Sequence, residues 1–282
     1  MKISKVTKAT ISKIYRPVQN DTHKGIQGHT LIIGGSYGKI GAPLLSSKAA
    51  LHSGCGLVTA FIPKIGYSIL QTALPEVMVL TDKNENNISN IEFSMEPQAI
   101  GIGIGMGQEP KTRRAFYKFL KSNEVPLVID ADALNIVAYN PKWLLNLKPQ
   151  TILTPHLKEL ERIIGKWNSD KEKFEKTAAF SKFFNCIVVM KGAPTYIFSN
   201  EKCFENSTGN PALATAGSGD VLTGIVTSLL AQNYLAEDAA ILGVYIHGLT
   251  SDLARPHTGT QAFTASTIIE YLGKSFLEIE QF

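Results

Sequence analysis

The chain has 282 residues, 44% hydrophobic and 18% charged, as expected of a globular protein with one large domain or two small ones. Its formal net charge is +4 and its lysines are scattered, so the composition gives no reason to expect a nucleic-acid partner. No apolar run approaches the ~18 residues needed to span a membrane and the N-terminus has no apolar signal core, so we expect a cytoplasmic protein.

The first third of the chain predicts a strand, a glycine-rich loop and a helix. Residues 1–28 are polar and weakly patterned, and are expected to form an N-terminal arm or a short helix. Residues 29–33 form an apolar run that predicts a buried strand. Three glycines follow within residues 35–41, and a proline opens a predicted helix over residues 43–50. This order occurs at ligand sites of open α/β sheets, although the loop could equally be a flexible connector.

Two more strands are predicted from apolar runs at residues 56–62 and 99–104, with a possible further strand at residues 77–80. Residues 81–90 are polar and are expected to be a surface excursion. Glycines alternate with apolar residues from Gly101 to Gly107. On a strand this would leave one face without side chains, which suits close approach by a ligand or by a neighbouring helix.

Polar residues follow the next two predicted strands. Residues 126–130 lead into Asp-Ala-Asp-Ala-Leu-Asn at residues 130–135, and residues 151–153 lead into Thr-Pro-His, ending at His156. Ligand sites in α/β proteins lie at the carboxyl ends of such strands. A helix is predicted directly afterwards, over residues 157–164, so His156 could face a cleft or simply cap that helix. A lone histidine is more often structural.

A strongly apolar strand is predicted at residues 186–190, and it leads into Lys-Gly-Ala-Pro-Thr at residues 191–195. A hairpin is expected next, followed by helices over residues 236–254 and from about Thr264. The chain has no Cys-x-x-Cys pair, and its odd number of cysteines predicts buried thiols and no disulfides. These cysteines are Cys55, Cys186 and Cys203.

Residues 206–224 are the most informative stretch. A polar, turn-rich half precedes Gly-Ser-Gly-Asp at residues 217–220 and an apolar helical run, which predicts a loop that enters a buried helix. Unpaired N–H groups at a helix start attract anions, and glycines let a phosphate approach the backbone. A carboxylate there suits phosphoryl transfer, in which it receives a proton or holds a hydroxyl in line. The tetrapeptide alone could also be a plain turn with Asp220 as a helix cap.

The alternation of strands and helices predicts a single α/β domain with a largely parallel sheet covered by helices on both faces. Four loops follow strands, at residues 34–42, 105–109, 130–135 and 154–156. We expect them to converge with the Gly-Ser-Gly-Asp helix start in one cleft. At a helix start the Asp220 carboxylate is expected to be stabilised as the anion, which would make it a weak base.

Five blocks taken together resemble the ADP/ATP-dependent NAD(P)H-hydrate dehydratases of the ribokinase-like superfamily, in order and spacing, and most closely the bacterial ADP-using branch. The blocks are residues 34–43, 130–135, 154–156, 191–195 and 206–220. The resemblance extends from about residue 25 to near the C-terminus. It implies a ribokinase-like three-layer sandwich as one domain over residues 1–282. It also implies pairing with a separate epimerase, since the chain has no room for the epimerase domain that some members carry.

The resemblance implies a repair reaction. ADP would phosphorylate the hydroxyl of hydrated NADH or NADPH (NADHX or NADPHX), and loss of phosphate would restore NADH or NADPH. Mg²⁺ would be the cofactor and the assembly a homotetramer. The choice between ADP and ATP, and between the two hydrates, stays open. One alternative is a ribokinase-like kinase of a vitamin precursor. A second is a non-catalytic nucleotide-binding sensor, which would have no need of the Asp220 carboxylate.

The same resemblance implies residue roles. Asp220 would be the catalytic carboxylate, placed on the substrate hydroxyl. The anion hole for the transferring phosphoryl group would be Gly217, Ser218 and Gly219. The nucleotide-binding residues would be Lys191, Gly192, Ala193, Pro194, Thr195 and Gly219. The NAD(P)HX-binding residues would be Ala42, Gly105, His156 and Asp220. The block that contains Asp130, Asp132 and Asn135 would serve Mg²⁺ or phosphate through water.

Overall fold

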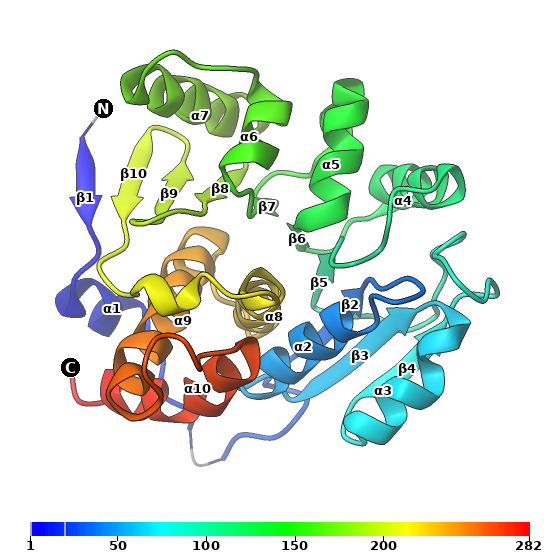
Figure 1. Cartoon of the computed structure of the whole chain (residues 1–282), viewed down its shortest axis with the longest axis horizontal. Coiled ribbons are helices and arrows are strands. Elements are labelled where there is room, and N and C mark those ends of the chain that lie inside the picture. Colours follow the sequence, from blue (N-terminus) through cyan, green and yellow to red (C-terminus); the bar gives the residue numbers. More distant parts are fainter. Residues whose placement is uncertain (1, 20) are drawn as a thin grey trace.

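Ten strands form one sheet through the middle of the molecule (Figure 1). The computed structural model describes residues 2–19 and 21–282. The strands lie side by side in the order β1-β10-β9-β8-β7-β6-β5-β2-β3-β4. Their bounds are β1 (Ile3–Lys5), β2 (His29–Ile33), β3 (Leu57–Ile62), β4 (Met78–Thr81), β5 (Ala99–Ile102), β6 (Leu127–Ile129), β7 (Ile152–Leu153), β8 (Ile187–Met190), β9 (Tyr196–Ser199) and β10 (Lys202–Glu205).

Neighbouring strands are parallel, except that β9 runs antiparallel to both β8 and β10. In the register of the central strands, Leu31 lies opposite Thr59 on one side and Ile100 on the other. Strands that are covered on both faces need a continuous apolar run, and Leu31, Ile32 and Ile33 of β2 are all fully buried. The largely parallel sheet and the hairpin of β9 and β10 confirm the sequence predictions.

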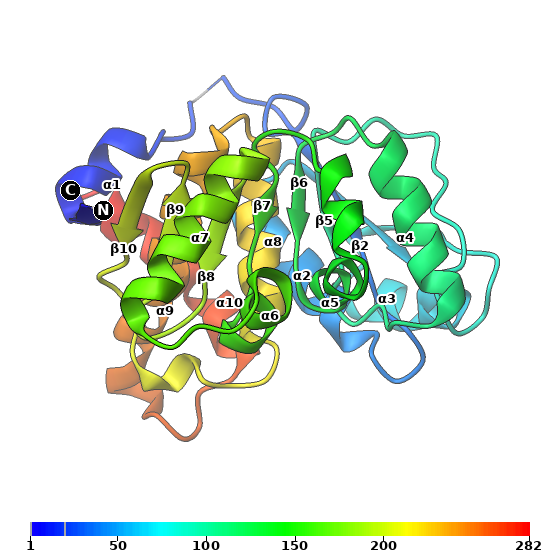
Figure 2. The same cartoon turned by 90° about the horizontal axis from the view of Figure 1, so that it is seen from above.

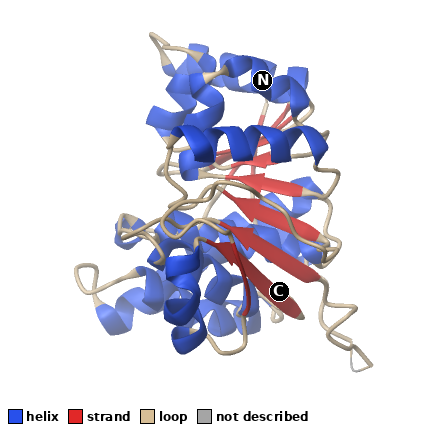
Figure 3. Ribbon diagram, turned by 90° about the vertical axis from the view of Figure 1, so that its right-hand side faces the viewer, coloured by secondary structure: helices blue, strands red, loops and turns tan. Residues whose placement is uncertain are grey.

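Helices cover both faces of the sheet (Figure 3). The cluster of buried residues on one face includes side chains of α2, α3, α8, α9 and α10. The cluster on the other face includes side chains of α4–α6, with partly buried side chains of α7 packed against it, and these four helices lie nearest the viewer in Figure 2. The expected three-layer α/β sandwich is therefore confirmed. The helices are α1 (Lys8–Ile14), α2 (Gly41–Leu51), α3 (Tyr67–Ala73), α4 (Pro110–Ser122), α5 (Ala131–Tyr139), α6 (Leu157–Ile164), α7 (Asp170–Phe184), α8 (Ser218–Ala231), α9 (Ala236–Thr258) and α10 (Ala265–Ile279), with 3₁₀ turns η1 (Lys64–Gly66), η2 (Pro141–Asn146) and η3 (Pro211–Leu213).

The N-terminal segment takes part in the sheet. The short helix expected there is confirmed as α1, which starts with a capping box between Thr7 and Thr10. In addition, β1 pairs in parallel with β10 at the edge of the sheet. All three residues of β1 are exposed, so the strand has no apolar pattern by which it could be predicted. Residues 1 and 20 of the expected arm lie outside the described residues.

The strand predicted over residues 99–104 ends early. β5 stops at Ile102, and Gly103, Gly105 and Gly107 have φ angles of 121°, 58° and 75°. Such angles are incompatible with an extended strand, and glycine reaches them without strain. The prediction of a strand face without side chains was therefore wrong beyond Ile102, because these glycines form a loop at the carboxyl edge of the sheet.

Two other sequence predictions concern burial. Of the excursion predicted over residues 81–90, Thr81 ends β4 and residues 82–90 contain no helix or strand. Asp82 and Ile88 are buried, so the segment is partly packed onto the fold. All three cysteine thiols are free and buried, as predicted. Across residues 2–19 and 21–282, we find no helix with the length and apolar character that a bilayer crossing requires.

The contact between α2 and α8 fixes the position of α8. A Cβ on Gly224 would lie 2.1 Å from the Ser46 carbonyl oxygen and 3.0 Å from Ala49 Cβ. The hydroxyl of Ser46 donates a hydrogen bond to the carbonyl of Asp220, and the hydroxyl of Ser228 donates one to Ala50, 2.9 Å away. Backbone contact this close leaves no space for a side chain at position 224, so α2 and α8 are held directly against each other.

We predict that Gly224→Ala destabilises the protein although alanine is the better helix former. Overpacking costs about 1–3 kcal/mol and should outweigh the ~1 kcal/mol gain in helix propensity. The matched control is Gly273→Ala in α10, where an added Cβ meets nothing within 4 Å. That variant should gain about 0.5–1 kcal/mol. Urea unfolding measures both, and equal effects from the two variants would refute close packing at Gly224.

Candidate active site

The start of α8 lacks a side-chain cap. Gly217 occupies the N-cap position with a φ of 84°, and no side chain there bonds to the helix. The N–H of Val221 is satisfied by the carbonyl of Gly217, 3.0 Å away. In the described part of the chain, the N–H groups of Gly219 and Asp220 find no acceptor. Two backbone donors at the positive end of a long helix therefore remain available to an anion.

A charged pair lies beside this helix start. Lys191 follows β8, and its Nζ donates to Oδ1 of Asp130, 2.8 Å away, at the end of β6. The hydroxyl of Thr223 donates to the other oxygen of Asp130, also at 2.8 Å. A Cβ on Gly219 would lie 3.3 Å from Lys191 Nζ and 3.7 Å from Asp130 Oδ2. The lysine ammonium and the free N–H groups of α8 thus border the same space, as convergence at one sheet edge predicted.

Thr223 was not among the residues singled out from the sequence. It lies one helical turn after Gly219, and its hydroxyl oxygen is also 3.2 Å from the Gly219 carbonyl oxygen. The i, i+4 spacing from Gly219 is the signal that could have indicated it. Its contact with Asp130 ties α8 to the central strand β6 and so fixes the depth of the helix start.

The block of Asp130, Asp132 and Asn135 acts as a scaffold in this structure. Asp130 caps α5 by accepting from the Ala131 N–H at 2.8 Å. Asp132 accepts from the Gly107 N–H at 2.9 Å and so fastens the loop after β5. Asn135 accepts from Arg162 at 2.6 Å. Within residues 2–19 and 21–282, no group of three or more His, Cys, Asp or Glu side chains is arranged to hold a metal ion.

Asp220 differs from the sequence expectation in its acidity. Burial raises the pKa of its carboxyl to about 6, with a further contribution from the negative charge of Asp130 and opposition from Lys191. The expectation that the helix start would hold Asp220 as a weakly basic anion was therefore wrong. The helix dipole acts on an exposed group by a fraction of a kcal/mol, whereas burial beside a second carboxylate costs more. Asp220 is a stronger base than an ordinary aspartate.

Two of the residues assigned to the hydrate pocket lie against each other. A Cβ on Gly105 would approach Ala42 Cβ to 3.0 Å and the Lys39 carbonyl oxygen to 2.9 Å. The hydroxyl of Ser36 donates to the Gly105 carbonyl at 2.8 Å and joins the loop after β2 to the loop after β5. The two glycine-rich loops therefore form one continuous surface, and the interpretation of the first as a flexible connector is not supported.

His156 caps α6. Its Nδ1 accepts from the N–H groups of Lys158 and Glu159 at 3.1 and 3.2 Å, so the proton of the neutral ring is on Nε2, which lies 3.4 Å from Glu159 Oε1. Burial, reinforced by the charge of Lys191, lowers the pKa of this histidine. His156 also forms a backbone bridge with Lys191, which places it beside the charged pair. It can contribute a ring surface to the pocket, but both ring nitrogens already have partners.

The segment of residues 191–195 forms a short turn at the same edge. The hydroxyl of Thr195 donates to the carbonyl of Gly192 at 3.0 Å and accepts from its N–H at 3.3 Å. Residues 192–194 are exposed, whereas Lys191 points back to Asp130. The turn is therefore open to a ligand on one side and joined to the charged pair on the other.

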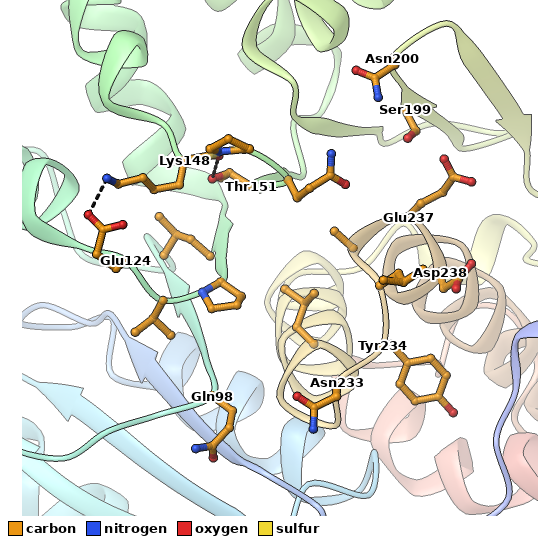
Figure 4. Close-up of a pocket in the computed structure, with 18 of the residues that line it drawn as sticks. Gln98, Glu124, Lys148, Thr151, Ser199, Asn200, Asn233, Tyr234, Glu237 and Asp238 are labelled. Atoms are coloured by element: carbon orange, nitrogen blue, oxygen red, sulfur yellow. Dashed lines mark hydrogen bonds and ion pairs between the residues drawn. The ribbon is translucent and has the colours of Figure 1, made fainter.

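A separate cavity of about 580 Å³ lies at the opposite edge of the sheet and contains none of the candidate residues (Figure 4). It lies between the starts of β6 and β7, the end of α8 and the start of α9. Its lysines already have partners, since Lys148 pairs with Glu124 and Lys202 with Glu237. The carboxyl edge of the sheet, where the chemistry-bearing side chains meet, is therefore the candidate active site.

We predict that Asp220→Asn stabilises the protein at pH 8 and not at pH 4. A carboxyl whose folded pKa is raised stabilises the fold only below its unfolded pKa, and that contribution is lost as the pH rises through about 6. Removing the charge should recover at most about 3 kcal/mol at pH 8, a few degrees in Tm. Thermal unfolding of both proteins across this range tests it, and a difference that does not change with pH would contradict the buried, ionising carboxyl.

Comparison with known proteins shows the family to which this chain is similar. A model of the NAD(P)H-hydrate dehydratase family matches residues 30–274. The ADP-dependent (S)-NAD(P)H-hydrate dehydratase of Neisseria meningitidis is 34% identical over 257 residues, which cover 88% of this chain and 84% of that protein. The bifunctional NAD(P)H-hydrate repair enzyme Nnr of Moorella thermoacetica is 34% identical over 270 residues, 92% of this chain and 51% of that one. The chain thus spans about half the length of the bifunctional relatives it matches.

A solved structure has the same fold. The ADP/ATP-dependent NAD(P)H-hydrate dehydratase of Bacillus subtilis, co-crystallised with ATP and Mg²⁺, superposes with a TM-score of 0.84 at 26% identity, and 99% of each chain is covered. The family match includes every residue singled out above, from Ala42 to Asp220. The chain therefore belongs to the NAD(P)H-hydrate dehydratase family.

Proposed function

We propose that this protein is an ADP-dependent NAD(P)H-hydrate dehydratase that returns (6S)-NADHX and NADPHX to NADH and NADPH. One observation carries the proposal: the uncapped start of α8 lies beside the Lys191 ammonium, and its first turn bears the Asp220 carboxylate, which accepts no hydrogen bond from the described residues. The free N–H groups and Lys191 suit a transferring phosphoryl group, and Asp220 suits the hydroxyl that attacks it. Family membership supplies the substrate class.

The reaction requires a phosphoryl transfer because hydroxide is a poor leaving group. In the first step the hydroxyl oxygen of the hydrate bonds to the β-phosphorus of ADP, the bond to the bridging oxygen breaks, and AMP leaves. In the second step the ring nitrogen lone pair expels phosphate, and a proton lost from the adjacent carbon restores the double bond. The products are NADH or NADPH, AMP, inorganic phosphate and one proton.

Asp220 would act in the first step. A carboxyl with a pKa of about 6 is ionised at neutral pH, yet is a better proton acceptor than an ordinary aspartate. The loose transition state of phosphoryl transfer does not need the proton early, so Asp220 also serves by holding the hydroxyl in line. Lys191 would stay near the phosphate through its hydrogen bond with Asp130, and residues 191–195 would contact the rest of the nucleotide.

The described residues do not build a dedicated Mg²⁺ site. The Asp130 carboxylate already accepts from Ala131, Lys191 and Thr223, and no cluster with metal-ligand character occurs within residues 2–19 and 21–282. Mg²⁺ keeps several waters and commonly binds to proteins through substrate phosphates. We therefore propose that the ion, when used, arrives as the complex with ADP.

Three further features remain proposals for this chain: a homotetrameric assembly, a cytoplasmic location, and cooperation with a separate NAD(P)HX epimerase. The last is supported by the family resemblance and by relatives that are named as bifunctional NAD(P)H-hydrate repair enzymes. Light scattering on a sizing column measures the assembly directly.

The proposed roles of Gly219 and Asp220 predict that one variant loses ADP affinity and the other loses turnover. Gly219→Val should fold but bind ADP at least ~10-fold more weakly, because a side chain there enters the space beside Lys191 Nζ. Asp220→Asn should keep ADP affinity and lose at least ~10²-fold in kcat, the usual scale for a lost acid–base group. Calorimetry and single-turnover kinetics separate the two. Unimpaired ADP binding by folded Gly219→Val, or normal turnover by Asp220→Asn, would remove that residue from the site.

The complete reaction is tested with acid-generated NADH hydrate, ADP and Mg²⁺. NADH absorbance should recover, with one AMP and one phosphate formed per NADH, and nothing should recover without a nucleotide. ATP is run beside ADP, and the NADPH hydrate beside the NADH hydrate, to settle both preferences. A stable phosphorylated product without free phosphate would identify a small-molecule kinase. Nucleotide binding with no product at all would identify a sensor.

A further inference from the structure

A buried histidine on the neighbouring helix α9 contacts the start of α8. His247 lies on α9, which packs against α8 below the sheet (Figure 1). Only 9% of its surface is exposed, and the reaction proposed above assigns it no part. A histidine in such a position must have hydrogen-bond partners, because an unpaired buried ring nitrogen costs about 1–3 kcal/mol.

The partner of His247 is the anion-hole residue Ser218. Nε2 of His247 lies 3.0 Å from the carbonyl oxygen of Ser218 and 3.1 Å from its hydroxyl oxygen. A carbonyl oxygen can only accept, so Nε2 carries the proton and donates to Ser218. Burial lowers the pKa of His247 to about 4, with opposition from the bond to Ser218 and reinforcement by Lys191, so the ring stays neutral at working pH.

The same stretch of α9 anchors the loop that leads into α8. The hydroxyl of Thr208 donates to the Tyr245 carbonyl at 2.8 Å. Asp252 accepts from the Gly209 N–H at 2.8 Å and from the Asn210 side chain at 2.9 Å. These contacts hold the loop over residues 208–210, but they do not reach the helix start. The contact of His247 is with Ser218, the residue directly before Gly219, and so it does reach the helix start.

We propose that His247 is a positioning residue for phosphoryl transfer: by fixing Ser218, it aims the N–H groups of Gly219 and Asp220 at the phosphoryl group. The inference rests on the proposed function for its kinetic consequences, while its geometry stands on the two contacts with Ser218. Hydrogen-bond donors at an anion site stabilise the transition state only when they point at it accurately. A displacement of such a group by about 1 Å can lower the rate ~10²-fold. His247 does not touch the substrate in this account.

The kinetic test compares two substitutions of His247. His247→Leu fills the volume but lacks the donor, and should lower kcat about 10- to 100-fold while the KM for the hydrate changes less than ~3-fold. His247→Gln can place an amide N–H near Ser218, and should recover kcat to within about 5-fold of wild type. The matched control is Ile246→Val, at the neighbouring, fully buried position of α9, which should lose stability but keep kcat. Full kcat in His247→Leu, or no rescue by glutamine, would overturn the proposal.

A spectroscopic readout makes the test independent of turnover. With ¹⁵N-histidine labelling, the His247 signal, identified by its loss in His247→Gln, should show a neutral ring protonated at Nε2 from pH 6 to 8. ADP should shift this N–H resonance more than AMP does, since only ADP carries the phosphoryl group to be transferred. If wild type repairs no hydrate but the ADP shift is present, the proposed function fails and the positioning stands. A ring protonated at Nδ1, or no shift with ADP, would refute the positioning.

Discussion

The arrangement of the candidate active site depends on one constraint: α8 begins without a side-chain cap of its own, at a half-buried position. The helix packs against α2, α9 and the sheet, and Gly217 supplies the left-handed turn but no capping oxygen. Buried backbone N–H groups without acceptors are costly, and folded proteins leave very few of them. The N–H groups of Gly219 and Asp220 find no acceptor in the described residues, but both residues are half-buried, so water or the phosphoryl group of the proposed reaction can satisfy them.

Several charged side chains lie close together and partly buried at this edge of the sheet, so each one affects its neighbours. Asp130 is almost fully buried, but its oxygens accept from Lys191, Thr223 and the start of α5. Asp220 has no such partners among the described residues, and it lies near enough to Asp130 for that charge to raise its pKa. One carboxylate is thus fixed as a scaffold and the other stays available for chemistry. The two aspartates thus differ in their hydrogen bonding, and in the proposed function this leaves Asp220 for the chemical step.

Much of this arrangement could be predicted from the sequence because it is a consequence of topology. Apolar runs such as residues 29–33 and 186–190 predict parallel strands, and the loops after such strands must meet at one edge. Other features depend on distant residues. The exposed strand β1 pairs with a strand some 200 residues later, and the pKa of Asp220 depends on burial and on Asp130, in another element. The sequence around His247 does not indicate a role for it, because its contact is with Ser218, which lies on a different helix.

The central claim is that the uncapped start of α8, with Lys191, is the phosphoryl site. The most direct measurement is a crystal structure of the protein with ADP bound in the absence of hydrate. The account predicts that the terminal phosphate accepts hydrogen bonds from the N–H groups of Gly219 and Asp220 and lies within reach of Lys191 Nζ, with the Asp220 carboxylate on the side away from AMP. A terminal phosphate bound elsewhere, with the first turn of α8 unoccupied, would contradict it.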